Sequence, residues 1–114
     1  MNYSQEAEEA KKFFDNCHSL LTKKANDYAN NADCFSNFSK IAYVCDIPRE
    51  KTFIVFMAVK LARIVELLDK EAKNESLADS LADIANYACL MQMFLNEHKK
   101  EEPLIDIEGN EIRR

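Results

Sequence analysis

Two carboxylates and an amide lie at helical spacing on a stretch of the chain that is otherwise largely apolar. They are Asp79, Asp83 and Asn86, within residues 77–91. Positions i, i+4 and i+7 of an α-helix lie within about 60° of one another, so all three side chains project from one stripe. Like charges at this spacing repel, and partial burial raises the cost unless a cation compensates. A metal ion, a lysine or an arginine must therefore accompany them.

The preceding helical segment carries the side chains that could answer these carboxylates, Lys60, Arg63 and Glu66. A short connection makes the two segments antiparallel neighbours. In one interpretation, Lys60 and Arg63 pair with the two aspartates in a structural ion network. In the other, Glu66, Asp79 and Asp83 bind Mg²⁺ through oxygen atoms, and Lys60 and Arg63 contact the phosphates of a ligand.

Three positions also have alternative explanations. Ser76 and Asp79 match the spacing of a capping box, in which Asp79 would only satisfy backbone groups at a helix start. Tyr28 and Phe38 flank a polar segment and could stack on a nucleotide base, or could pack onto the protein core.

The composition indicates an all-α protein. A chain of 114 residues with 1 glycine and 2 prolines forms one domain and lacks the turn residues that sheets need. The net charge of −5, with no basic run longer than two residues, argues against a nucleic-acid polymer as partner. The polar N-terminus and the short apolar runs predict no membrane segment. The 4 cysteines show no CxxC pairing, which favours reduced thiols in a cytoplasmic protein.

The periodicity predicts a single helical domain over residues 1–102. Four helices are expected, at about 3–25, 35–45, 49–72 and 76–100, with an Asn/Asp-rich loop at 26–34. Alternating apolar residues around Gly109 and Asn110 predict a short β-hairpin or extended arm over 103–114.

The segment 53–59 is apolar on all sides of its helix. Burial on every side is therefore expected, and a domain of this size offers little room for it. We expect a homo-oligomer that covers this segment at a subunit interface.

Three stretches resemble the nucleotide modification associated domain 1 family of phage and bacterial proteins. They read DYANNADCFSNF (27–38), KLARIVELL (60–68) and ESLADSLADIANYACL (75–90), and the resemblance covers about 27–92. Members of that family carry an Asp-Tyr-Gly loop, a Ser-Asn-Phe element, a Lys-Leu-x-Arg helix and a final Asp-x-x-x-Asp-x-x-x-Tyr-Ala helix. Ala29 stands here in place of the loop glycine.

That family is similar to the all-α nucleoside triphosphate pyrophosphohydrolases of the MazG and dimeric dUTPase type. The resemblance implies a four-helix MazG-like bundle, oligomerisation, and Mg²⁺ bound by a Glu-Glu-x-x-Glu and a Glu-x-x-Asp motif. Glu66 and Asp83 match the last residue of each motif. The other glutamates are replaced by Ala62, Arg63 and Ser80, with Asp79 as the available substitute for the last of these.

The resemblance implies a nucleotide-binding protein with a pocket between the third and fourth helices. The expected ligand contacts are Asp27, Tyr28, Phe38, Lys60, Arg63 and Asn86, and the expected Mg²⁺ ligands are Glu66, Asp79 and Asp83. An active form would be a hydrolase that splits a nucleoside triphosphate between its α and β phosphates. Two alternatives stay open. One is a non-catalytic phage-type binder that sequesters a nucleotide, a nucleotide signal or a protein partner. The other is a helical interaction protein whose polar stripe is purely structural.

Overall fold

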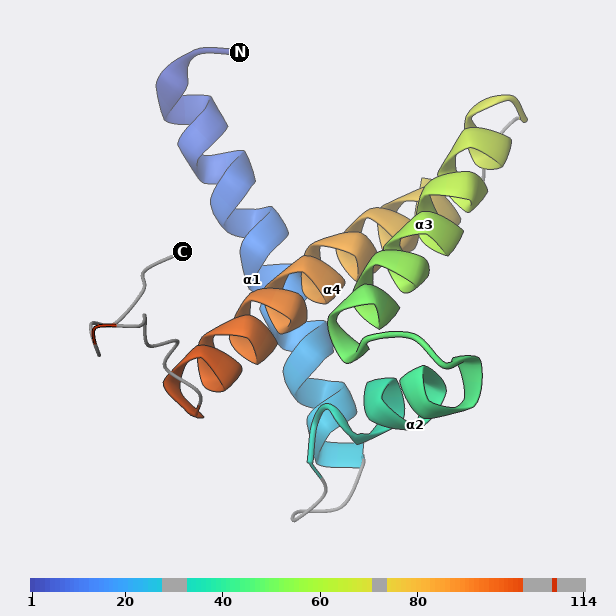
Figure 1. Ribbon diagram of the computed structural model, residues 1–114. Helices are drawn as coiled ribbons and strands as arrows, with labels where there is room; N and C mark the ends of the chain where they lie inside the picture. Colours follow the sequence, from blue (N-terminus) through green and yellow to red (C-terminus); the bar gives the residue numbers. More distant parts are fainter. Residues whose placement is uncertain (28–32, 71–73, 102–107, 109–114) are drawn as a thin grey trace.

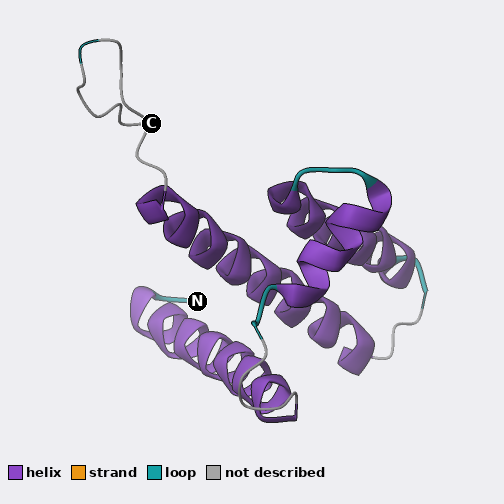
Figure 2. Cartoon of the chain, turned by 60° about the horizontal axis from the view of Figure 1, so that its bottom comes forward, coloured by secondary structure: helices purple, strands orange, loops and turns teal. Residues whose placement is uncertain are grey.

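The computed structural model describes residues 1–27, 33–70, 74–101 and 108 (Figure 1). The regular elements in these ranges are four α-helices, α1 (Tyr3–Asp27), α2 (Ser36–Cys45), α3 (Arg49–Leu68) and α4 (Asn74–Glu101), and none of these residues forms a strand (Figure 2). The all-α class is thus confirmed for this part of the chain. The predicted arm at 103–114 lies outside it apart from Glu108, as does most of the 26–34 loop.

Local sequence explains where α2 ends and α3 begins. Asp46 follows α2 in the left-handed conformation, with φ of 55°, which aspartate tolerates better than most residues. The Ile47 amide then donates to the Ala42 carbonyl at 3.1 Å and closes the last turn. Pro48 precedes the first residue of α3, where its missing amide costs nothing.

The connection between α3 and α4 lies earlier in the chain than the periodicity predicts. Helix α3 ends at Leu68 instead of 72, because Asp69, a poor helix former, takes the C-cap position. Helix α4 begins at Asn74, two residues before the predicted start. Ser76 therefore lies inside α4 and is not the N-cap residue that a capping box with Asp79 requires, so that interpretation is wrong.

The core is a cluster of aromatic rings shared by α3, α4 and the segment that contains α2. Phe35, Phe38, Phe53 and Phe94 are buried and touch one another. The Phe38 and Phe53 rings stack at 4.4 Å between centroids, and Phe94 lies 5.4 Å from both Phe35 and Phe53. These contacts fix α3 and α4 as antiparallel neighbours, as Figure 1 shows.

Helix α1 packs against α4 alone among the described helices, and its N-terminal half extends away from the rest of the molecule (Figure 1). Helix α2 packs against α3, in front of the α3–α4 pair in Figure 2. No helix in the described ranges is long and apolar enough to cross a membrane.

The apolar segment 53–59 divides into two parts. Phe53 is fully buried, and Phe56 and Met57 are partly buried against the core of the same chain. Ile54 and Val59 are 51% and 59% exposed. The predicted burial on every side is therefore not met within one chain, because α2 and α4 cover only part of the helix surface.

Replacement of Phe53 by alanine should cost about 3–5 kcal/mol of unfolding free energy, because it removes the ring on which Phe35, Phe38 and Phe94 converge. Urea denaturation followed by circular dichroism measures the loss. Val55→Ala is the matched control, since Val55 is half exposed on the same helix, and should cost about 0.5 kcal/mol or less. Equal losses in the two variants would contradict this description of the core.

Candidate functional site

The predicted polar residues share one side of the α3–α4 pair. Lys60, Ile64 and Leu67 on α3 and Ser80, Ile84 and Tyr87 on α4 follow at helical spacing from the Phe53–Phe94 ring contact that joins the two helices, and all are at least partly buried. We take them as the positions at which the two helices contact each other. In an antiparallel pair, the residues that immediately precede such contact positions turn to the same side on both helices. We call this the polar side. It carries Arg63, Glu66, Asp79, Asp83 and Asn86.

Lys60 and Asp83 form an ion pair that bridges the two helices. The Lys60 Nζ atom lies 2.9 Å from Asp83 Oδ2, and the side chains are only 27% and 21% exposed. Partial burial strengthens such a pair, because less water screens it. The structure therefore places a lysine where the sequence required a cation to accompany Asp83.

The other two predicted metal ligands are exposed. Lys70, one turn further along the chain, donates a hydrogen bond to Glu66 at 3.0 Å. That bond and the Lys70 charge lower the pKa of Glu66, with a smaller contribution from Arg63. Asp79 and Arg63 both lie on the surface.

Glu66, Asp79 and Asp83 do not form a metal-binding group in the single chain. Among the described residues, no three His, Cys, Asp or Glu side chains are placed to hold a metal ion together. Mg²⁺ needs several oxygen ligands around one point, whereas lysines already neutralise Asp83 and Glu66. The residues present therefore do not fit a resident Mg²⁺ in this arrangement.

The remaining predicted ligand contacts have structural partners or lie outside the described part. Asn86 Nδ2 donates to the Cys17 carbonyl at 3.0 Å and ties α4 to α1. Phe38 is buried in the core, which is the packing alternative of the sequence analysis. Nothing is described of Tyr28 or of the Asp27 side chain, so their contacts with a ligand stay predictions.

A cluster that the sequence analysis does not predict joins the start of α3 to the end of α4. Arg49 Nη2 lies 2.7 Å from His98 Nε2, and His98 Nδ1 lies 2.9 Å from the Phe94 carbonyl. Because the carbonyl can only accept, Nδ1 carries the proton and Nε2 accepts from the guanidinium. The Arg49 guanidinium also lies over the Phe94 ring, 5.0 Å from its centroid. The cluster fixes the register of the two helices.

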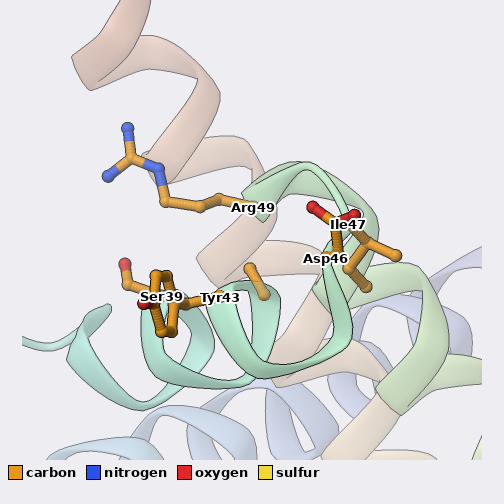
Figure 3. Close-up of a pocket in the computed structure, with 6 residues that line it drawn as sticks. Ser39, Tyr43, Asp46, Ile47 and Arg49 are labelled. Carbon is orange, nitrogen blue, oxygen red and sulfur yellow. The ribbon is translucent and has the colours of Figure 1, made fainter.

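Arg49 also borders an open pocket of about 400 Å³ between α2 and the start of α3 (Figure 3). Its other lining residues are Ser39, Ala42, Tyr43, Asp46 and Ile47. The opposite charges of Asp46 and Arg49 give it no preference for a ligand of one sign, and it contains none of the predicted site residues.

Comparisons with protein-family models, curated proteins and solved structures found no match for this chain.

The hydrogen bond from Asn86 to the Cys17 carbonyl should help to keep the Cys17 thiol buried and slow to react. Burial raises the pKa of this thiol, so at mildly alkaline pH it should react with iodoacetamide more slowly than the exposed Cys45 and Cys89. Asn86→Ala removes a bond worth about 1 kcal/mol and should speed Cys17 alkylation about fivefold, as read by mass spectrometry. Asn96→Ala, whose side chain bonds only to Gln92 among the described contacts, should leave the rate unchanged. An unchanged rate in Asn86→Ala would contradict the α1–α4 contact.

A double-mutant cycle tests whether the coupling free energy of the Lys60–Asp83 pair is larger than that of an exposed surface pair. Lys60→Met, Asp83→Asn and their combination should give a coupling free energy of about 1–2 kcal/mol in urea unfolding at fixed protein concentration, because the pair is mostly shielded from water. The same cycle on Glu66 and Lys70, which are both 66% exposed, should give about 0.5 kcal/mol or less. Indistinguishable couplings would mean that Lys60 and Asp83 do not hold the helices together.

Proposed function

We propose that the protein is a non-catalytic, MazG-like nucleotide-binding protein that holds the phosphates of its ligand with Lys60 and Arg63. The observation that carries the proposal is the Lys60–Asp83 ion pair. It neutralises the carboxylate that the family resemblance assigns to a metal, and it holds a lysine at the same place.

The cations on α3 suit a phosphorylated ligand. Lys60 and Arg63 are three residues apart, so their side chains leave the helix on neighbouring positions one turn apart. Arg63 is exposed and can contact phosphate oxygens with two N–H groups. A phosphate group carries more negative charge than a carboxylate and would compete with Asp83 for Lys60.

Phosphate binding to Lys60 in place of Asp83 and metal binding by Asp83 predict opposite effects of neutralising Asp83. If a phosphate replaces Asp83 as the partner of Lys60, then Asp83 repels the ligand, and its neutralisation should tighten binding. If Asp83 instead holds Mg²⁺, its neutralisation should abolish binding.

A Mg²⁺-dependent nucleoside triphosphate pyrophosphohydrolase is the second candidate. It is favoured by Glu66 and Asp79, which stay exposed on the same side of the α3–α4 pair as Asp83. For this function, Asp83 would have to leave Lys60 and join these two carboxylates around the metal.

Calorimetric titration with nucleoside mono- and triphosphates, first in EDTA and then in Mg²⁺, tests the proposal. We expect binding in EDTA, weakened roughly 10- to 100-fold by Lys60→Met through loss of a charge-assisted hydrogen bond, and tightened a few-fold by Asp83→Asn. Asp46→Asn makes the same charge change away from the polar side and should leave the affinity unaltered.

Three results would contradict it. Binding that requires Mg²⁺, is abolished by Asp83→Asn and is accompanied by pyrophosphate release would establish the hydrolase. Weaker binding in Asp83→Asn would remove the proposed competition. No binding of any nucleotide in either condition would reject nucleotides as ligands.

A further inference from the structure

Helix α3 presents an apolar series to solvent with the spacing of a coiled-coil seam. Ile54, Ala58, Leu61, Val65 and Leu68 follow one another at alternating intervals of four and three residues. All five are exposed, and the four large side chains are between 51% and 65% exposed. Phe53, Met57, Lys60, Ile64 and Leu67, which immediately precede them, are all buried or partly buried.

Helix α4 continues this surface. Residues that immediately follow contact positions turn, on both helices, to the side opposite the polar side. On α4 these are Leu81, Ala85, Ala88, Gln92 and Leu95, of which Leu81 and Leu95 are 45% and 39% exposed. We call the ten residues from α3 and α4 the apolar face. None of the ten is charged, although 31% of the chain is; the charged Glu50, which follows the contact residue Arg49, lies at the end of the face.

The other described helices contact the α3–α4 pair elsewhere. Helix α2 reaches α3 through the Phe38–Phe56 ring contact, and α1 reaches α4 through the Asn86–Cys17 bond. Phe56 and Asn86 both immediately precede a contact position, so these contacts lie toward the polar side and leave the apolar face in solvent.

We propose that the apolar face is covered by the same face of a second copy of this chain, so that two α3–α4 pairs form a four-helix core. A second copy suits this face because an uncharged strip of exposed apolar side chains along two neighbouring helices has the composition of a homodimer interface core.

The face is complementary to itself under one two-fold axis. If α3 packs antiparallel to its copy about residues 59–60, Ala58 faces Leu61 of the second copy and Ile54 faces Val65. A small residue then meets a large one at Ala58 and Leu61, and two β-branched side chains meet at Ile54 and Val65, which suits knobs-into-holes packing. The same alignment brings Lys51 near Asp69 of the second copy, an exposed pair of opposite charge.

The residues of α4 at the same level are also compatible with this two-fold axis. The Lys60–Asp83 pair and the Phe53–Phe94 ring contact together place residue 60 of α3 level with about residues 83–87 of α4. An axis at residues 59–60 therefore crosses α4 near Ala85, where Leu81 faces Ala88 of the second copy and the two Ala85 residues meet. Small side chains at the crossing let the two α4 helices approach closely. The polar side then faces solvent in both copies, so the assembly does not depend on the proposed ligand.

Light scattering coupled to size-exclusion chromatography tests the proposal on the full chain. Wild type should have twice the 13.1 kDa mass of one chain, and Leu61→Glu should have the mass of a single chain while it keeps the helical signal. Val59→Glu is the matched control: Val59 is 59% exposed on α3 but outside the apolar face, so this variant should stay dimeric.

A monomeric wild type would overturn the proposal, because the face would then be covered by residues 102–114 of the same chain or by another protein. Equal loss of the dimer in Val59→Glu and Leu61→Glu would also overturn it. The wild-type mass decides the question even if Leu61→Glu fails to fold.

Disulfide trapping tests the axis. In a chain with the exposed Cys34, Cys45 and Cys89 changed to serine, Ala85→Cys should form a covalent dimer on oxidation. Asp79→Cys, on the polar side of the same helix, should not. Cross-linking of Asp79→Cys as fast as Ala85→Cys would reject this packing.

Discussion

The antiparallel contact between α3 and α4 is the constraint on which the rest of the structure depends. Phe53 faces Phe94, and Lys60 faces Asp83. Because of the helical repeat, the residues that precede each contact position lie on one side of the pair, and those that follow it lie on the other. The charged residues lie toward the first side, where α1 and α2 also pack. An uncharged apolar surface lies on the second side. A single register therefore determines both the candidate site and the proposed interface.

The same register explains why carboxylates at suitable spacing do not make a metal site here. The side chain that lies level with Asp83 is a lysine, and the side chain one turn from Glu66 is another. Glu66 and Asp83 are each paired with a lysine, and the charges of Lys60, Arg63 and Lys70 balance those of Glu66, Asp79 and Asp83. Such a surface suits reversible exchange of one anion for another better than the concentrated negative charge that a divalent cation requires.

Much of the fold could be predicted from the sequence, because its signals are local. Pro48 and Asp46 set the boundary between α2 and α3, and the helical periodicity predicted the helices that the structure describes. The apolar excess at 53–59 was also visible, but the sequence could not tell that Phe53 turns inward and Ile54 outward, since that depends on where α4 lies. The side of α3 left for a partner extends to Leu68, well beyond the predicted segment.

The site was harder to predict, for the same physical reason. Lys70 at i+4 from Glu66 is a local signal that could have been read from the sequence. The Arg49–His98 contact joins residues 49 positions apart and requires the helix register to be known. Sequence spacing could bring Lys60 and Asp83 into consideration together, but only tertiary structure decides whether they pair with each other or bind a ligand.

Isotope-filtered nuclear Overhauser spectroscopy on a mixture of labelled and unlabelled chains tests the central claim most directly. The account predicts intermolecular contacts between the Leu61 and Ala58 methyl groups, with none from Val59. Intermolecular contacts confined to other surfaces, or contacts from Leu61 only within its own chain, would contradict the division of the α3–α4 pair into a polar side and an apolar face.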